Sequence, residues 1–140
     1  MYDVLKQIGN WPPEVPAARK EKLHVHIPPE KTLKLIHGKD HHTRMDLFIS
    51  NEQCHVGIHT IPGGKFADPE TNKGDKCMLV LKGKMQIRVL KSEADEASVS
   101  TPAWDVKEHE VFFVPEGVRH QVFNLGKGTL KYLFTVAPNL

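Results

Sequence analysis

The residues best suited to chemistry in this chain are its histidines and a few charged residues close to glycine turns. Nine histidines among 140 residues is a high count for a chain of otherwise ordinary composition. In the segment Pro115–Asn124, Pro115 and Gly117 predict a sharp turn after an apolar run, and His120 begins the next run. An imidazole at such a position can bind a metal or transfer a proton near neutral pH. His120 is therefore the first candidate site residue.

The spacing of this segment, P-x-G-x-x-H-x-x-x-N, resembles the second signature motif of the cupin superfamily. Pro115, Gly117, His120 and Asn124 occupy its named positions. The resemblance implies that His120 faces the interior of a β-barrel, where the histidine of the family is a metal ligand. One residue departs from the family pattern, because His109 stands where a glycine is usual.

An upstream segment resembles the first cupin motif, G-x5-H-x-H-x3-E-x6-G, in its spacing but not in its ligands. Gly64 and Gly83 stand at the two glycine positions, whereas Glu70, Asn72 and Lys76 replace the two histidines and the glutamate. The resemblance therefore supports the fold but does not imply a bound metal. It also implies that the three replaced positions converge with the histidine of the second motif on one cavity.

Lys76 makes metal binding at a cupin-type site unfavourable. A protonated amine cannot bind a metal, and it repels a cation by about 4 kcal/mol at about 4 Å when the effective dielectric constant is near 20. We therefore expect no metal cofactor at this position. The alternative is a divalent transition metal held by a rearranged set consisting of His120, Glu70 and His59.

Lys76 and Glu70 are expected to face each other as an ion pair inside the barrel, because buried charges need partners. Two interpretations of this pair stay open. In one, the pair is structural. In the other, Lys76, Glu70 and His120 form a catalytic proton-transfer set, since buried neighbours can shift the pKa of a lysine or a glutamate. Metal-free acid–base chemistry is found among the deoxysugar epimerases, which are relatives of the cupins.

Three further residues are candidates for lining the pocket. Asn72 occupies a former ligand position, and His59 lies three residues before the Pro62–Gly63 turn. Arg88 lies on the polar face of an alternating run and could meet an anionic substrate. The remaining histidines that we considered are expected to be surface residues, namely His24, His26, His41, His42 and His109.

Short β-type runs separated by glycine and proline turns predict an all-β fold. We expect a single-domain cupin-type double-stranded β-helix, a jelly-roll-like barrel of roughly ten strands. The expected strands are 22–27, 32–37, 44–50, 54–61, 77–81, 84–90, 104–106, 111–114, 120–124 and 130–137. The apolar run Val111–Val114 is typical of a strand buried on both sides, and Ser92–Ala103 is predicted to be an exposed loop.

Aromatic residues are expected to be buried by default. Trp104 is predicted to pack against its neighbours. The others are predicted to lie in the core, namely Phe112, Phe113, Phe123, Tyr132 and Phe134.

The first 20 residues differ from the rest and are predicted to form an N-terminal arm, with the barrel spanning residues 21–140. Asp3–Ile8 could form one or two helical turns. The proline-rich segment Trp11–Pro16 is predicted not to be helical, because proline lacks an amide donor and restricts the residue before it. Pairing of exposed sheet edges favours a homodimer.

Charge and composition exclude several classes of partner. The net charge is +2 without a dense basic cluster, so no nucleic-acid partner is expected. The sequence has no apolar stretch of membrane-spanning length and no secretory leader pattern at its start. Cys54 and Cys77 have no metal-type spacing, and we expect two buried free thiols in the cytoplasm.

These observations favour a cytoplasmic barrel that binds a small-molecule ligand or substrate. In its sharper form it is a metal-independent acid–base enzyme of the isomerase, epimerase or lyase type, acting on a polar metabolite such as a sugar or an organic acid. One alternative is a metal-dependent oxygenase, isomerase or lyase with ligands around His120. Another is a non-catalytic sensor or accessory module.

Overall fold

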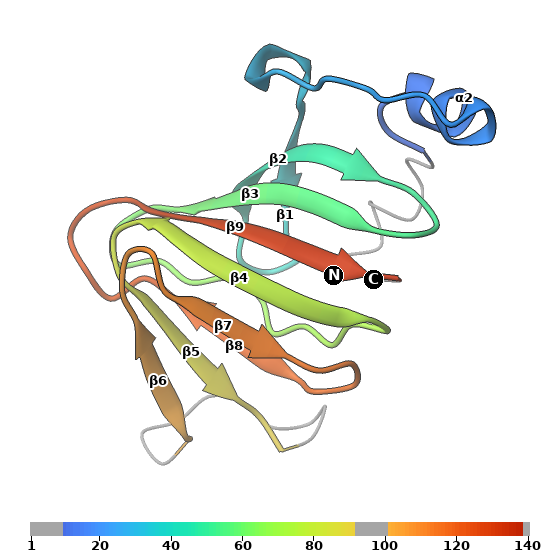
Figure 1. Cartoon of the computed structure of the whole chain (residues 1–140). Helices are drawn as coiled ribbons and strands as arrows, with labels where there is room; N and C mark the ends of the chain where they lie inside the picture. The colour runs from blue at the N-terminus through green and yellow to red at the C-terminus, as the bar shows by residue number, and fades with distance from the viewer. Residues whose placement is uncertain (1–9, 92–100, 139–140) are drawn as a thin grey trace.

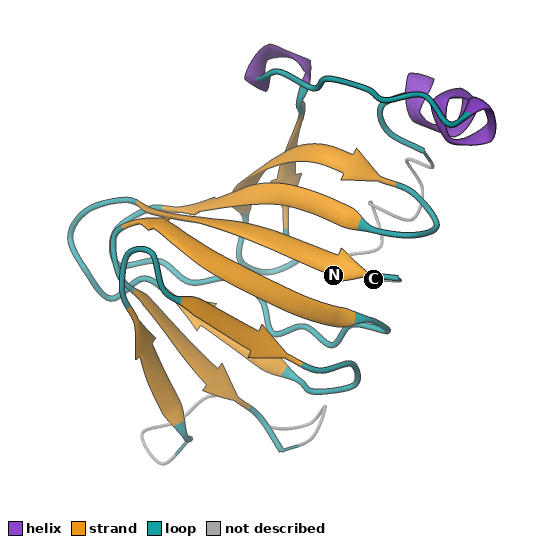
Figure 2. Cartoon of the chain, in the orientation of Figure 1, coloured by secondary structure: helices purple, strands orange, loops and turns teal. Residues whose placement is uncertain are grey.

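Two antiparallel sheets form the body of the molecule in the computed structural model, which describes residues 10–91 and 101–138 (Figures 1 and 2). The larger sheet has the order β1-β2-β3-β9-β4-β7, and the smaller has the order β6-β5-β8. The strands are β1 Leu33–His37, β2 Thr43–Ser50, β3 His55–Ile61, β4 Asp75–Lys82, β5 Met85–Val89, β6 Ala103–Val106, β7 Val111–Val114, β8 His120–Phe123 and β9 Leu130–Ala137. The expected all-β barrel is confirmed.

The last strand joins the two parts of the larger sheet, because β9 lies between β3 and β4 and pairs with both. Period-2 alternation turns one side chain inward and the next outward along these strands. On β9, Tyr132, Phe134 and Val136 are buried. Gly57 on β3 lies against Phe134, and a Cβ atom at this glycine would come within 2.7 Å of the Phe134 ring. The core therefore lies between the two sheets, at the inner ends of these side chains.

The end of the proline-rich segment begins a helix, so our prediction for Trp11–Pro16 is wrong at Glu14–Pro16, whereas Trp11, Pro12 and Pro13 precede the helix. Helix α2 spans Glu14–Glu21. Pro16 lies in its first turn, where amide groups have no acceptor within the helix, and a missing donor therefore costs nothing. Trp11 ties this segment to β2, since its backbone exchanges two hydrogen bonds of 2.8 and 2.9 Å with Ser50. The expected helical turns at Asp3–Ile8 lie outside the described residues.

The predicted strand at residues 22–27 is also wrong. Lys22 has a left-handed backbone (φ 57°, ψ 39°) and ends α2, and the residues that follow it are not in a sheet. Leu23 and Val25 are 61% and 37% exposed. A strand needs a neighbour to accept its hydrogen bonds, and this segment is extended without one. A short 3₁₀ helix, η1 (Pro29–Lys31), then leads into β1.

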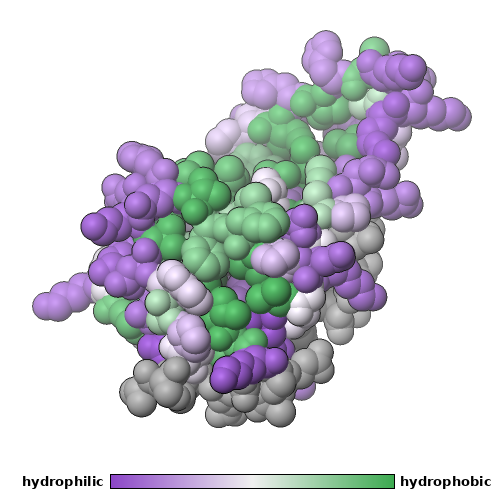
Figure 3. Space-filling model, turned by 60° about the horizontal axis from the view of Figure 1, so that its bottom comes forward, coloured by the Kyte–Doolittle hydropathy of each residue, from purple (hydrophilic) through white to green (hydrophobic). Residues whose placement is uncertain are grey.

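Strand β7 is an edge strand, which corrects the expectation that Val111–Val114 is buried on both sides. Val111 and Phe113 are 61% and 54% exposed, because β7 has β4 on one side and ends the sheet. Trp104 is 47% exposed and packs its ring against Phe112 at 5.9 Å between centroids. Apolar side chains gather in the middle of the face drawn in Figure 3.

Both cysteines are free thiols, but the prediction that both are buried is wrong. Cys54 is half-buried and Cys77 is exposed on the outer face of β4. The predicted loop at residues 92–103 falls mostly outside the described residues, and Ala103 already belongs to β6. No helix among the described residues is long and apolar enough to cross a membrane.

Candidate functional site

The backbone places Glu70 directly opposite His120. The amide of Glu70 donates to the carbonyl of His120 at 2.9 Å, and the amide of His120 donates to the carbonyl of Glu70 at 3.0 Å. Residues that exchange both hydrogen bonds in an antiparallel pair project their side chains from the same face. The segment that carries the first motif is thereby held beside β8, and the two side chains meet inside the barrel.

Lys76 reaches the same point from the larger sheet. It lies on β4 between Val114 of β7 and Val136 of β9, and alternation turns it inward where Cys77 turns outward. Its side chain is 2% exposed. The Nζ atom donates a hydrogen bond to Glu70 Oε1 and lies 5.8 Å from the centroid of the Tyr132 ring. A buried ammonium is thus paired with a carboxylate beside an aromatic face.

His120 completes this group with one ring nitrogen engaged and the other turned toward Glu70. Nδ1 lies 3.1 Å from the carbonyl oxygen of Val118, so it carries the proton and donates. Nε2 lies 3.3 Å from Glu70 Oε1 but has no hydrogen-bond partner of good geometry among the described residues. The His120 side chain is fully buried. A buried ring nitrogen in this state needs a partner from outside the protein, such as a water molecule or a ligand atom.

The charges of the cluster fix the state of Glu70. Burial by itself raises the pKa of this carboxyl, but the Lys76 ammonium and the neighbouring His120 ring outweigh it and hold the pKa well below its usual value. Glu70 is therefore a carboxylate at neutral pH. We call Glu70, Lys76 and His120 the ionic cluster.

A second polar group lies beside the ionic cluster and joins the predicted residue His59 to Thr43 and His37, which the sequence analysis does not name. Thr43 Oγ1 lies within hydrogen-bonding distance of both the His37 carbonyl, at 3.4 Å, and His59 Nε2. His59 Nδ1 and the Tyr132 hydroxyl share a hydrogen bond of 2.6 Å. If Thr43 donates to the carbonyl, it accepts from His59 Nε2–H, and His59 then accepts from Tyr132. The His37 ring stands edge-on to His59 at 5.3 Å.

Burial keeps this second group uncharged. Desolvation lowers the pKa of His37, and it lowers the pKa of His59 still further, with the Lys76 ammonium adding to both shifts. Burial and the Glu70 carboxylate together raise the pKa of Tyr132 well above its usual value. His37 could have been found from the sequence, because it continues the inward positions of Leu33 and Leu35 at a spacing of two.

The other predicted pocket residues lie in different places. Asn72 is buried, and its carbonyl accepts the amide of Gly117 at 2.9 Å, which ties the two motifs together. Arg88 lies on the opposite face of β5 from buried Ile87, with its guanidinium 4.7 Å from the Phe123 ring centroid. This placement puts Arg88 outside the ionic cluster. The histidines expected on the surface are exposed.

The donors present do not fit a divalent metal in this arrangement. Within residues 10–91 and 101–138, no group of three or more His, Cys, Asp or Glu side chains could hold a metal ion. Both nitrogens of His59 are engaged by Thr43 and Tyr132, and Glu70 is engaged by Lys76. The rearranged ligand set of His120, Glu70 and His59 stays a prediction, and it would need these contacts to break.

Comparison with solved structures identifies the architecture. The structure resembles a cupin protein with a double-stranded β-helix fold from Methanocaldococcus jannaschii, at 15% identity and a TM-score of 0.57, over 76% of this chain and 89% of that one. It also resembles a protein described as a predicted oxalate decarboxylase from Thermotoga maritima, at 14% identity and a TM-score of 0.64, over 81% of this chain and 99% of that one. The chain has the cupin fold.

A third cupin-fold neighbour is the iron(II) form of the protein named HppE, at 15% identity and a TM-score of 0.64, over 80% of this chain and 60% of that one. No family model matches the sequence, and no curated protein matches it. At these identities the likeness establishes the fold alone. The cupin signature spacings are therefore present in a cupin fold whose ligand positions differ.

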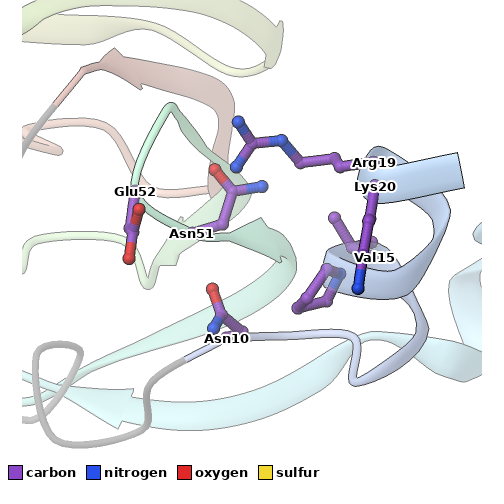
Figure 4. A pocket seen from close by; sticks show the side chains of 7 residues that line it. Asn10, Val15, Arg19, Lys20, Asn51 and Glu52 are labelled. Carbon is purple, nitrogen blue, oxygen red and sulfur yellow. The ribbon is translucent and has the colours of Figure 1, made fainter. Parts of the chain in front are cut away.

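A separate pocket lies at the surface, beside α2 (Figure 4). Its volume is about 330 Å³, and it is lined by Asn10, Val15, Pro16, Arg19, Lys20, Asn51 and Glu52. Arg19 extends from the helix toward Asn51. This pocket contains none of the residues of the ionic cluster, so we treat it as distinct from the candidate site.

Proposed function

We propose that this cupin barrel binds a polar small molecule, such as a sugar or an organic acid, and transfers protons on it with the ionic cluster, without a metal at that position. The observation that carries the proposal is the convergence of Lys76, Glu70 and His120 on one buried point. Three ionisable side chains are costly to bury together unless they have a role, and such clusters gather at functional sites.

In the proposed reaction, each member of the cluster has its own role. His120 gives or takes the proton, because its Nε2 is the ring nitrogen without a hydrogen-bond partner among the described residues. The Val118 carbonyl, which accepts from Nδ1, orients the imidazole, and the Glu70 carboxylate beside Nε2 stabilises its protonated form. Lys76 stabilises negative charge that develops on the substrate, in a site from which water is largely excluded. These three roles suit the proton transfers of an isomerase, an epimerase or a lyase.

The second polar group supports the same proposal. A neutral His59, held in one tautomer by Thr43 and Tyr132, gives the wall of the site fixed hydrogen-bonding dipoles. Fixed dipoles cost no reorganisation when charge develops on a substrate.

We include a cytoplasmic location and a homodimer in the proposal. The homodimer is included because β7 presents exposed apolar residues at a sheet edge.

The proposal is tested by screening neutral sugars, polyols and organic acids for ligands that raise the thermal unfolding temperature, and by following each binder by NMR for conversion. We expect a binder that is converted, and His120→Gln should lower the turnover number by about 100-fold or more while changing affinity little. The exposed His109→Gln variant is the matched control.

Binding without conversion in the wild-type protein would leave a non-catalytic sensor or accessory module as the function. Conversion that survives His120→Gln unchanged would overturn the assigned proton-transfer role. A screen in which no compound of any class binds would overturn the proposal as a whole.

A further inference from the structure

The ammonium of Lys76 has more donors than the described part of the protein uses. A lysine carries three N–H donors. Within residues 10–91 and 101–138, Glu70 accepts the one hydrogen bond that Lys76 donates, and the centroids of the Tyr132 and Phe134 rings lie 5.8 and 5.7 Å from Nζ. Aromatic faces attract a cation but are weak acceptors. The N–H donors of Lys76 that Glu70 leaves unused therefore favour a ligand that brings further acceptors to this site.

Glu70 is the more accessible partner of the pair. Its side chain is 13% exposed, whereas that of Lys76 is 2% exposed. A molecule that enters from solvent therefore reaches the carboxylate more readily than the ammonium. It can take the place of Glu70 on Lys76 only if it carries an equivalent charge, because a neutral group would leave the buried ammonium uncompensated. A cationic ligand would be repelled by Lys76.

We infer that the ligand of this site is a small carboxylate that displaces Glu70 from Lys76, and that the displaced Glu70 stays beside His120. This inference rests on the proposed function and names its substrate class. The exchange replaces one carboxylate by another on Lys76. A proton taken up with the ligand onto His120 Nε2, 3.3 Å from Glu70 Oε1, balances the displaced carboxylate, so no buried charge is left unpaired. The backbone pairing of Glu70 with His120 involves only main-chain atoms, so it persists while the Glu70 side chain rotates.

The proposed exchange and direct binding of the ligand by Glu70 predict opposite effects of the Glu70→Gln substitution on affinity. If Glu70 competes with the ligand for Lys76, Glu70→Gln removes the competitor and should tighten carboxylate binding by about tenfold or more. If Glu70 instead recognises the ligand directly, the same substitution weakens binding. Lys76→Met should abolish carboxylate binding, and Lys76→Arg keeps the charge as a second variant if Lys76→Met does not fold.

The experiment uses acetate, glycolate and malonate as probes, each beside its neutral amide, together with glycerol and glucose. Binding to the full chain is measured by titration calorimetry and by ligand-observed NMR. The exposed Glu116→Gln and Lys131→Met variants are matched controls and should leave affinity unchanged. We expect at least one carboxylate to bind while its amide does not, and Glu70→Gln to tighten that binding.

The outcomes separate this inference from the proposed function. Binding of glycerol or glucose without binding of any carboxylate would overturn the inference and leave the proposed function standing. Carboxylate binding that weakens in Glu70→Gln, or that is the same in Lys76→Met as in the wild type, would overturn the exchange. Absence of binding by every probe would overturn the inference, and the wider screen above would then decide the proposed function.

Discussion

Glu70 and His120 face each other across a backbone pair in which each amide donates to the other carbonyl, at 2.9 and 3.0 Å. This relationship fixes two positions that lie fifty residues apart in the sequence, and it brings the two cupin-like motifs together. It involves main-chain atoms alone, so we expect it to persist when another residue with an amide donor stands at position 70. The site can therefore be rebuilt by substitution without moving the backbone.

Restoring the ligands of the first cupin motif should create a metal site. The triple variant Glu70→His, Asn72→His and Lys76→Glu replaces a buried ammonium by a carboxylate and adds two imidazoles opposite His120. Four such ligands match the requirement of zinc. We expect elemental analysis after dialysis to find about one zinc per chain in this variant. Adding His120→Ala should remove the metal, and a triple variant that binds none would show that the four positions do not share one site.

Stability should fall as the pH drops from 7 toward 5. The pKa values of His37 and His59 lie below the usual 6.5 because burial disfavours their charged forms, whereas the unfolded chain has ordinary histidines. Below pH 6.5 the unfolded state therefore binds more protons, and each such proton adds a slope of about 1.4 kcal/mol per pH unit. The stability that these neutral histidines contribute is fully present above pH 6.5, and it is lost as the pH falls toward their pKa values in the folded state.

Urea unfolding between pH 5 and 8 measures this slope. His59→Asn should flatten the dependence, since it removes one of the three histidines whose pKa burial lowers, the other two being His37 and His55, whereas the exposed His24→Asn should leave it unchanged. A wild-type protein whose stability does not change over this range would contradict the burial of neutral imidazoles.

Asp68 holds the loop that follows His37. Its carboxylate accepts the backbone amides of Lys39, Asp40 and His41 at 2.6, 3.0 and 2.9 Å. Asp68→Ala should cost about 2 kcal/mol in the free energy of unfolding, because several hydrogen bonds to a charged acceptor are lost. Asp40→Ala, in the same loop, should cost little. Equal losses in the two variants, measured by urea unfolding, would argue against this anchor.

The ionic cluster could be predicted from two features of the sequence. The spacing of the two motifs predicts that position 70 lies near His120, and the alternation of a strand predicts that Lys76 and Cys77 point to opposite faces. The contact of His59 with His37 could not be read from spacing, because it joins β1 and β3, which are separated in the sheet by β2. The inward position of His37 could be predicted, because His37 follows Leu33 and Leu35 at a spacing of two on one face of its strand.

Two of the failed fold predictions concern residues whose composition fits more than one structure. Proline was treated as excluding a helix, although a first helical turn tolerates it, as Pro16 does in α2. The apolar run Val111–Val114 was interpreted as doubly buried, because an apolar edge strand and a central strand have the same composition. Position within the sheet depends on which strands pair, and β7 has β4 as its neighbour.

The central claim is that Lys76 and Glu70 form a coupled buried ion pair, and a double-mutant cycle in urea unfolding tests it most directly. Lys76→Met and Glu70→Gln should each cost about 3–5 kcal/mol, because each leaves a buried partner uncompensated. The double variant should cost less than the sum, with a coupling of about 2 kcal/mol or more. The surface pair of Lys84 and Asp105, 3.4 Å apart, should show a coupling below about 1 kcal/mol. A coupling between Lys76 and Glu70 as small as that of the surface pair would contradict the account.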